Sequence, residues 1–171
     1  EKKLKSSIRI PRLLIPVHFS GQPTDQEKIY NLSKKYKFKI LEDAAHSLGA
    51  KRKNFKVGNC KWSDITVFSF HPVKIITSGE GGSATTNDKK LYERMKLFRN
   101  HGVTKDFRMM KNKKKIKWYY EQIELGYNYW MSDINASLGI SQLKKANYFV
   151  KKRNFIAKTY NKHLKEIMQI Q

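Results

Sequence analysis

Two short apolar segments separated by a helical pattern constrain this chain more than any other feature. Residues Leu13–Phe19 (LLIPVHF) predict a buried strand, which ends at the turn signal Ser20–Pro23. Thr24-Asp25 then offers an N-cap for a helix that closes at Lys37-Phe38, and Lys39–Glu42 (KILE) predicts the next strand. A strand, a helix and a strand within about 30 residues predict a βαβ unit, so the two strands should be parallel in one sheet.

Two further strands and a helix are expected downstream. Ile65–Phe70 is rich in β-branched and aromatic residues and predicts a third strand, which Pro72 stops. Ser83–Thr86 can form a short further strand, and the apolar residues of Leu91–Phe98 predict a helix that ends near Gly102. With the βαβ unit, these elements predict an α/β fold in which helices flank a mostly parallel sheet.

The C-terminal part of the chain has a different pattern. Residues 103–117 are basic, have little periodicity and predict a mobile surface loop. Ser132 is a good N-cap, and apolar side chains at helical spacing continue to Leu164, which predicts a long amphipathic helical region with room for one break. Because this pattern stops at Gln171 with no capping element after it, we expect a truncated chain.

The composition sets the broad class of protein. Of 171 residues, 39% are hydrophobic and 12% aromatic, which is enough apolar material for the core of one ordinary domain. No apolar stretch approaches the roughly 20 residues that a membrane helix needs, and the charged start of the chain shows no signal peptide. The single cysteine, Cys60, leaves no internal disulfide possible. We therefore expect a soluble, cytoplasmic protein with no membrane role.

The charge balance is strongly positive, with 36 Lys and Arg against 14 Asp and Glu and a net charge of +22. Such a balance is typical of nucleic-acid binders. The basic residues recur through every segment and form no single stripe, which favours a solvated lysine-rich surface, and we do not expect nucleic acid as a partner. A functional polyanion surface is the alternative, and small anionic substrates should be steered toward either surface.

Two common kinds of site find no support in the sequence. The five histidines lack paired ligand spacing and Cys60 has no identifiable partner, so neither a metal site nor cysteine catalysis is expected. Gly79-Glu80-Gly81-Gly82 is rich in glycine, but a P-loop needs a Lys-Ser/Thr pair immediately before a helix, and here a strand is expected to follow. ATP binding is therefore not expected.

An acid and an amine follow two of the predicted strands. Asp43 comes directly after Lys39–Glu42, and Lys74 lies just beyond Ile65–Phe70. Ligands of α/β sheets bind beyond the carboxyl ends of the strands, so both side chains should face one crevice. Pyridoxal 5′-phosphate (PLP) engages both groups, because its aldehyde needs a lysine and its ring nitrogen needs an acid. On spacing alone, an ordinary aspartate and a surface lysine remain the more economical interpretation.

A set of ordered motifs resembles the DegT-type nucleotide-sugar aminotransferases of PLP fold type I. The motifs are Glu42–Ala50 (EDAAHSLGA), Ser69–Lys74 (SFHPVK), Gly79–Gly82 (GEGG), Thr86–Asp88 (TND), Ile15–Gln22 (IPVHFSGQ), Arg99–Gly102 (RNHG) and Gly126–Gly139 (GYNYWMSDINASLG). The resemblance implies that residues 1–131 are the central part of the PLP-binding large domain. Residues 132–171 would be a long helical segment leading toward a small C-terminal domain, and the chain would be truncated at both ends.

The resemblance also implies roles for individual residues. Lys74 would form the Schiff base with PLP and move the proton during transamination, and Asp43 would pair with the pyridinium nitrogen. Ser69 would bind the cofactor phosphate. His46 matches a family position close to the ring, although a packed core histidine explains it equally well. Asn128 matches an asparagine that reaches the phosphate in the neighbouring subunit's site, which implies a homodimer with shared active sites.

Within the family, His71–Thr77 (HPVKIIT) and Trp118–Gln122 (WYYEQ) look most like the pseudaminic-acid branch. That branch aminates C4 of a UDP-linked 4-keto-6-deoxy amino sugar, and an amino acid, typically glutamate, donates the nitrogen. Another DegT-type enzyme with a different keto sugar and an inactive polyanion-binding remnant are the alternatives. The chain departs from the family's GxNxRM motif at Trp130, where Arg is usual, which puts substrate binding or dimer geometry in question.

Overall fold

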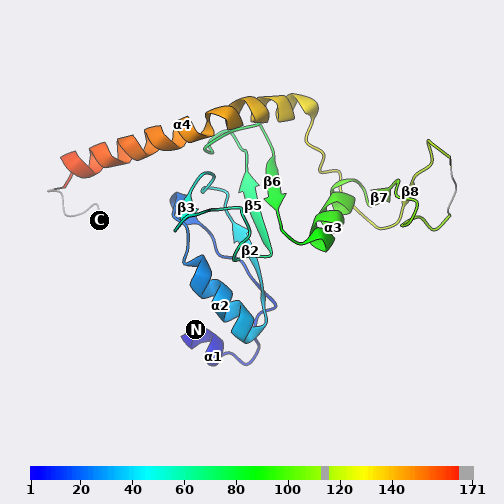
Figure 1. The fold of residues 1–171 in the computed structure, drawn as a ribbon, viewed down its shortest axis with the longest axis horizontal. Coiled ribbons are helices and arrows are strands. Elements are labelled where there is room, and N and C mark those ends of the chain that lie inside the picture. Colours follow the sequence, from blue (N-terminus) through cyan, green and yellow to red (C-terminus); the bar gives the residue numbers. More distant parts are fainter. Residues whose placement is uncertain (113–115, 166–171) are drawn as a thin grey trace.

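The computed structural model describes residues 1–112 and 116–165. Its centre is a four-stranded sheet in the order β1-β2-β5-β6 (Figure 1). The strands are β1 (Leu13–Leu14), β2 (Lys39–Asp43), β5 (Ile65–Ser69) and β6 (Gly82–Thr85). Strands β1, β2 and β5 are parallel, and β6 is antiparallel to β5. The prediction of an α/β fold with a mostly parallel sheet is therefore confirmed.

The predicted βαβ unit is present. Its helix, α2 (Gln26–Tyr36), begins after Asp25 as the N-cap and ends at Lys37, which has left-handed backbone angles. Leu13 then pairs with Lys39 in the parallel register that a crossover connection produces. Phe38 and Ile40 are buried, at 4% and 2% exposure, so the start of β2 anchors the core.

The first strand is shorter and more exposed than its apolar sequence predicts. Ladder pairing covers only β1 itself, although main-chain hydrogen bonds keep the following residues beside β2. Leu13, Ile15 and Val17 are 46%, 53% and 48% exposed, whereas the alternate residues Pro16 and His18 are buried. The prediction of a buried strand is wrong for this outer face, because β1 is an edge strand in the described part of the chain and successive side chains point to opposite faces.

Two small hairpins and one helix complete the region before α4. β3 (Lys51–Arg52) pairs with β4 (Phe55–Lys56), and β7 (Val103–Thr104) pairs with β8 (Glu121–Gln122). Helix α3 (Lys89–Arg99) follows β6, while the short α1 (Lys2–Lys5) and a 3-10 turn at Phe19–Gly21 lie near the start of the chain. The loop predicted at residues 103–117 thus begins with a paired strand, and its residues 113–115 lie outside the described residues.

Helix α4 (Asp133–His163) is continuous over 31 residues, so the break that the sequence allowed is absent. Ser132 caps it by accepting a hydrogen bond from the Asn135 main-chain N–H at 3.2 Å. The helix crosses the end of the sheet toward which β5 points (Figure 1), and there Asn135 Nδ2 donates to the carbonyl of Ser78 at 2.6 Å. None of the α4 residues is buried.

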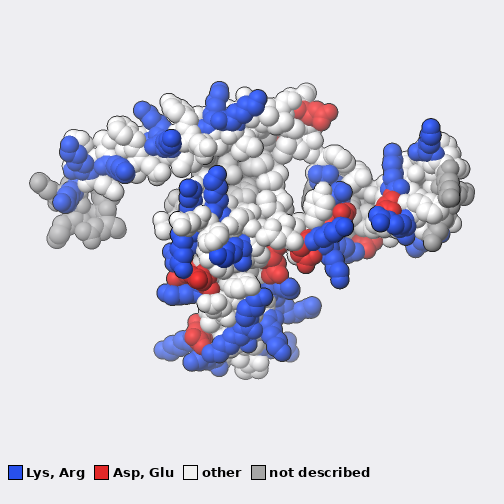
Figure 2. Space-filling model, viewed as in Figure 1, with Lys and Arg blue, Asp and Glu red and all other residues white. Residues whose placement is uncertain are grey.

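The surface carries the expected excess of positive charge. Figure 2 shows Lys and Arg on every arm of the visible face, densest around α1 and α2, with Asp and Glu among them. Among the helices of residues 1–112 and 116–165, none has the length and apolar character to cross a membrane.

Candidate functional site

The carboxyl ends of β2 and β5 bring three of the predicted site residues to one edge of the sheet. Asp43 is the last residue of β2 and pairs in register with Val67 of β5. Ser69 ends β5, and Lys74 follows in the turn beyond it, where its main-chain N–H donates to the carbonyl of His71 at 3.0 Å. The parallel arrangement therefore places these three residues at the same end of the sheet, as their spacing after the predicted strands indicates.

The turn that carries Lys74 is held at both ends. The Phe70 N–H donates to Gly81 O at 2.8 Å, and the Ser78 N–H donates to Phe70 O at 3.0 Å. Gly81 has a φ of +149°, and a methyl group added there would come within 2.5 Å of the Met131 Cε. Residues 70–81 thus form a closed loop whose backbone position depends on glycine.

Asp43 is half-buried, and its carboxylate is oriented by its own turn. The Ala45 main-chain N–H donates to Asp43 Oδ1 at 3.0 Å. Lys74 is also half-buried. Neither side chain forms an ion pair with any residue of the described ranges. A half-buried carboxylate and amine without charge partners form a donor set that fits a ligand with an aldehyde and a basic ring nitrogen, as in PLP.

Ser69 and His46 lie at the same end of the sheet. Ser69 Oγ accepts a 3.4 Å hydrogen bond from the His71 N–H. His46 is exposed, so the alternative of a packed core histidine is wrong. It lines a cavity of about 490 Å³ between the turns that follow β1 and β2, together with Ile75, which adjoins Lys74, and Arg153 of α4. Of the predicted site residues, His46 lines this cavity, whereas Asp43, Ser69 and Lys74 are not among its lining residues.

Asn128 lies beside the end of α3. Its backbone forms a bridge with Asn100, at the end of α3. The neighbouring main chain is fixed there as well, because the Tyr127 N–H donates to Phe98 O at 2.7 Å. The expected role of Asn128 in the site of a neighbouring subunit stays a prediction.

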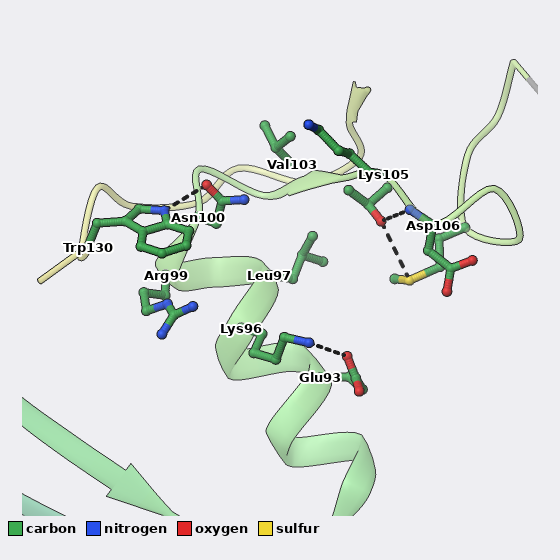
Figure 3. Close-up of a pocket in the computed structure, with 11 residues that line it drawn as sticks. Glu93, Lys96, Leu97, Arg99, Asn100, Val103, Lys105, Asp106 and Trp130 are labelled. Carbon is green, nitrogen blue, oxygen red and sulfur yellow. Dashed lines mark hydrogen bonds and ion pairs between the residues drawn. The ribbon is translucent and has the colours of Figure 1, made fainter. Parts of the chain in front are cut away.

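Trp130 lines a second cavity, of about 440 Å³, together with residues of α3 (Figure 3). Its indole Nε1 donates to Asn100 Oδ1 at 2.8 Å, and the Arg99 guanidinium carbon lies 4.5 Å from its ring centroid. A guanidinium group is thus present next to the position where the family motif has Arg, although it comes from α3.

Sequence reasoning missed a buried polar pair under Asp43. His18 is fully buried and Glu42 is 2% exposed, with His18 Nε2 3.3 Å from Glu42 Oε2. Burial alone raises the pKa of Glu42, but hydrogen bonds from His18 and Gln26 outweigh it and leave this pKa below its usual value. The available signal was a histidine at an inward position of an otherwise apolar strand. Within the described residues, no group of three His, Cys, Asp or Glu side chains could hold a metal ion.

Comparison with known proteins gives a consistent assignment. Residues 5–171 match the DegT/DnrJ/EryC1/StrS aminotransferase family. A UDP-4-amino-4,6-dideoxy-N-acetyl-beta-L-altrosamine transaminase of Campylobacter jejuni is 41% identical over 163 residues, which are 95% of this chain and 40% of that protein. The chain thus spans about two fifths of the length of this relative.

Solved structures agree with the sequence match. Helicobacter pylori PseC, an aminotransferase involved in the biosynthesis of pseudoaminic acid, superposes with a TM-score of 0.79 and 38% identity over 88% of this chain and 38% of that chain. A Streptococcus pneumoniae protein described as a sugar aminotransferase, solved in its PLP form, gives a TM-score of 0.76 and 29% identity over 90% of this chain and 41% of that chain. The fold is therefore that of the PLP aminotransferases.

Proposed function

The chain belongs to the DegT/DnrJ/EryC1/StrS aminotransferase family, and on that premise we propose that it is the lysine-bearing part of a PLP-dependent nucleotide-sugar aminotransferase. The observation that carries the proposal is the placement of Asp43 and Lys74. Asp43 ends β2 and Lys74 lies in the turn beyond the adjacent parallel strand β5, and both are half-buried and have no ion-pair partner in the described chain. Residues 1–131 would belong to the large domain, and residues 132–171 would lead toward a small domain.

The proposed cofactor contacts follow from this placement. Lys74 would hold PLP covalently, Asp43 would face the ring nitrogen, Ser69 would bind the phosphate and His46 would lie near the ring. Asn128, whose backbone bridges Asn100 at the end of α3, would serve the site of a second copy in a homodimer. When bound, PLP supplies an electron sink for the carbanion formed at the amino donor.

Each residue has a task that its surroundings support. The Asp43 carboxylate, oriented by the Ala45 N–H, would keep a proton on the ring nitrogen by its negative charge. The Lys74 Nζ would accept the proton from Cα of the amino donor and deliver it to the cofactor carbon C4′. Main-chain hydrogen bonds fix the backbone of the closed loop 70–81. Only the flexible side chain of Lys74 would therefore have to move during this proton transfer.

The proposed substrate is a UDP-linked 4-keto-6-deoxy amino sugar, with glutamate as amino donor, in pseudaminic acid and surface glycan biosynthesis in the cytoplasm. The names of the relatives support this choice. Lys51 and Arg153 line the cavity beside His46 and would face an anionic diphosphate. Product analysis with a panel of UDP- and dTDP-linked keto sugars tests it, and amination of a different sugar would favour another DegT-type activity.

The direct test is covalent trapping. We expect purified chain mixed with PLP and reduced with borohydride to carry a pyridoxyl group on Lys74, identified by peptide mass mapping. Lys74→Ala should remove this label, whereas Lys61→Ala, at an exposed lysine, should retain it. Equal labelling of Lys74 and the surface lysines would contradict the proposal. Steeply salt-dependent binding to duplex DNA without Lys74 labelling would instead support a polyanion-binding remnant.

A further inference from the structure

A buried hydrogen-bond network includes Glu42, the residue that precedes the predicted cofactor-binding Asp43. His18 Nε2 is 3.3 Å from Glu42 Oε2, and the Thr66 hydroxyl donates to the same oxygen at 3.1 Å. The exposed fractions of His18, Glu42 and Thr66 are 0%, 2% and 0%. A carboxylate in such a place is tolerated only when several donors satisfy it.

The hydrogen bonds assign the tautomer of His18. The Thr24 main-chain N–H donates to His18 Nδ1 at 3.3 Å, so Nδ1 is an acceptor and carries no hydrogen. Nε2 therefore carries the hydrogen and donates to Glu42. The Gln26 amide nitrogen lies 3.4 Å from Nε2 but is also a donor, so the two do not bond to each other. Gln26 instead donates to the Glu42 carboxylate. His18 thus acts as a neutral bridge between the turn after β1 and the end of β2.

The main chain of His18 also holds Asp43, the residue that follows Glu42. The His18 N–H donates to Asp43 O at 2.9 Å, and the Asp43 N–H donates to Pro16 O at 3.0 Å. Because successive side chains of a strand point to opposite faces, burial of Glu42 in the network directs Asp43 away from it. The Asp43 carboxylate then meets the Ala45 N–H at 3.0 Å.

We infer that the His18–Glu42 pair is a positioning device that sets the direction of the Asp43 carboxylate at the sheet edge. That this positioning aids cofactor binding rests on the proposed function, whereas the positioning of Asp43 does not depend on it. If the pair served only general stability, any destabilising core substitution would disturb Asp43 as much as a change at His18.

Two variants of His18 separate its two hydrogen bonds. His18→Gln places an amide near the position of Nε2 and can still donate to Glu42. His18→Asn places its amide near Nδ1, so it can serve Thr24 but cannot reach Glu42. Leu97→Ala, at a buried position of α3, is the matched control for a loss of stability elsewhere.

The readout is the pH titration of the Ala45 amide in 15N NMR spectra, because an amide bonded to a carboxylate shifts as that carboxylate ionises. We expect the Ala45 shift change across the titration to fall about threefold or more in His18→Asn, since hydrogen bonds weaken steeply when misaligned. It should stay close to that of the parent chain in His18→Gln and Leu97→Ala. PLP affinity, measured by tryptophan fluorescence, should follow the same order.

An unchanged Ala45 titration in folded His18→Asn would overturn the inference, and so would an equal loss in Leu97→Ala. If His18→Asn does not fold, Glu42→Gln carries the same test, because an amide of similar size replaces the charged acceptor. A reduced Ala45 shift supports the inference there and an unchanged shift refutes it. The Ala45 readout needs no cofactor, so failure of Lys74 labelling in the parent chain would contradict the proposed function without touching this result.

Discussion

Removal of the His18 side chain should destabilise the folded chain far more than removal of an exposed histidine. His18→Ala deletes a hydrogen bond to the ionised Glu42 and leaves the Thr24 N–H without its acceptor. A hydrogen bond to a charged group contributes about 1.5–3 kcal/mol, and an unsatisfied donor costs about 1–3 kcal/mol. Together these two contributions predict a loss in the free energy of unfolding of about 2.5–6 kcal/mol.

Urea titration followed by circular dichroism measures this loss, with His163→Ala at the exposed end of α4 as the matched control. The control should change stability by less than about 0.5 kcal/mol. A loss below about 1 kcal/mol in His18→Ala at neutral pH would refute the argument that the buried network depends on this side chain.

The pH dependence gives a second check on the same variant. The pKa of Glu42 is lower in the folded chain than its ordinary value, with hydrogen bonds from His18 and Gln26 outweighing burial, which acts in the opposite direction. A carboxyl group with a lowered pKa adds stability above its unfolded pKa, and this contribution disappears as the pH falls through the folded pKa. The stability difference between the parent chain and His18→Ala should therefore shrink in acid. A constant difference from neutral pH to well below pH 4.5, the ordinary value for Glu42, would argue against the pair.

Three further predictions concern the region around α3 and β7. The Arg108 side chain and main chain hydrogen-bond to Asp106 and lower its carboxyl pKa to about 2, so Arg108→Ala should raise the NMR titration midpoint toward 3.8, and an unchanged midpoint would exclude this cause. Trp130→Ala should lower stability by about 1 kcal/mol through loss of the Asn100 hydrogen bond and the Arg99 contact, whereas Trp130→Phe should retain the ring contact, and equal losses would assign the whole effect to the hydrogen bond. Gly102 has a φ of +68° and its added methyl group would overlap the Glu124 carbonyl, so Gly102→Ala should cost more than about 1 kcal/mol in thermal unfolding, and a neutral result would contradict the left-handed assignment.

The order of elements around the site was predictable, because each depends on local periodicity. Apolar runs bounded by turn residues located β2 and β5, and the spacing of β1, α2 and β2 required β1 and β2 to be parallel. The expectation of a mostly parallel sheet placed the carboxyl ends of its strands at one edge, which predicted that Asp43 and the Lys74 turn lie near one another. The direct pairing of β2 with β5 was decided by the tertiary structure. The capping roles of Asp25, Asp88 and Ser132 are local for the same reason, although only Ser132 and Asp25 were anticipated.

Other features depended on what lies across the fold. The exposure of Leu13, Ile15 and Val17 follows from the position of β1 at the sheet edge, and the sequence of a strand does not reveal which faces are covered. The stacking of Arg99 on Trp130 joins α3 to a segment far along the chain.

Taken by itself, the amino-acid sequence determined the βαβ unit, the long C-terminal helix and the residue types at the sheet edge, since these are set by period and by short-range turn chemistry. Only the tertiary structure decided that His18 and Glu42 meet in the core, that His46 faces a cavity and that Asn128 pairs with Asn100. The physical reason is that burial and hydrogen-bond pairing arise between residues distant in sequence, where the partner fixes both the solvent exposure and the charge state of a polar side chain.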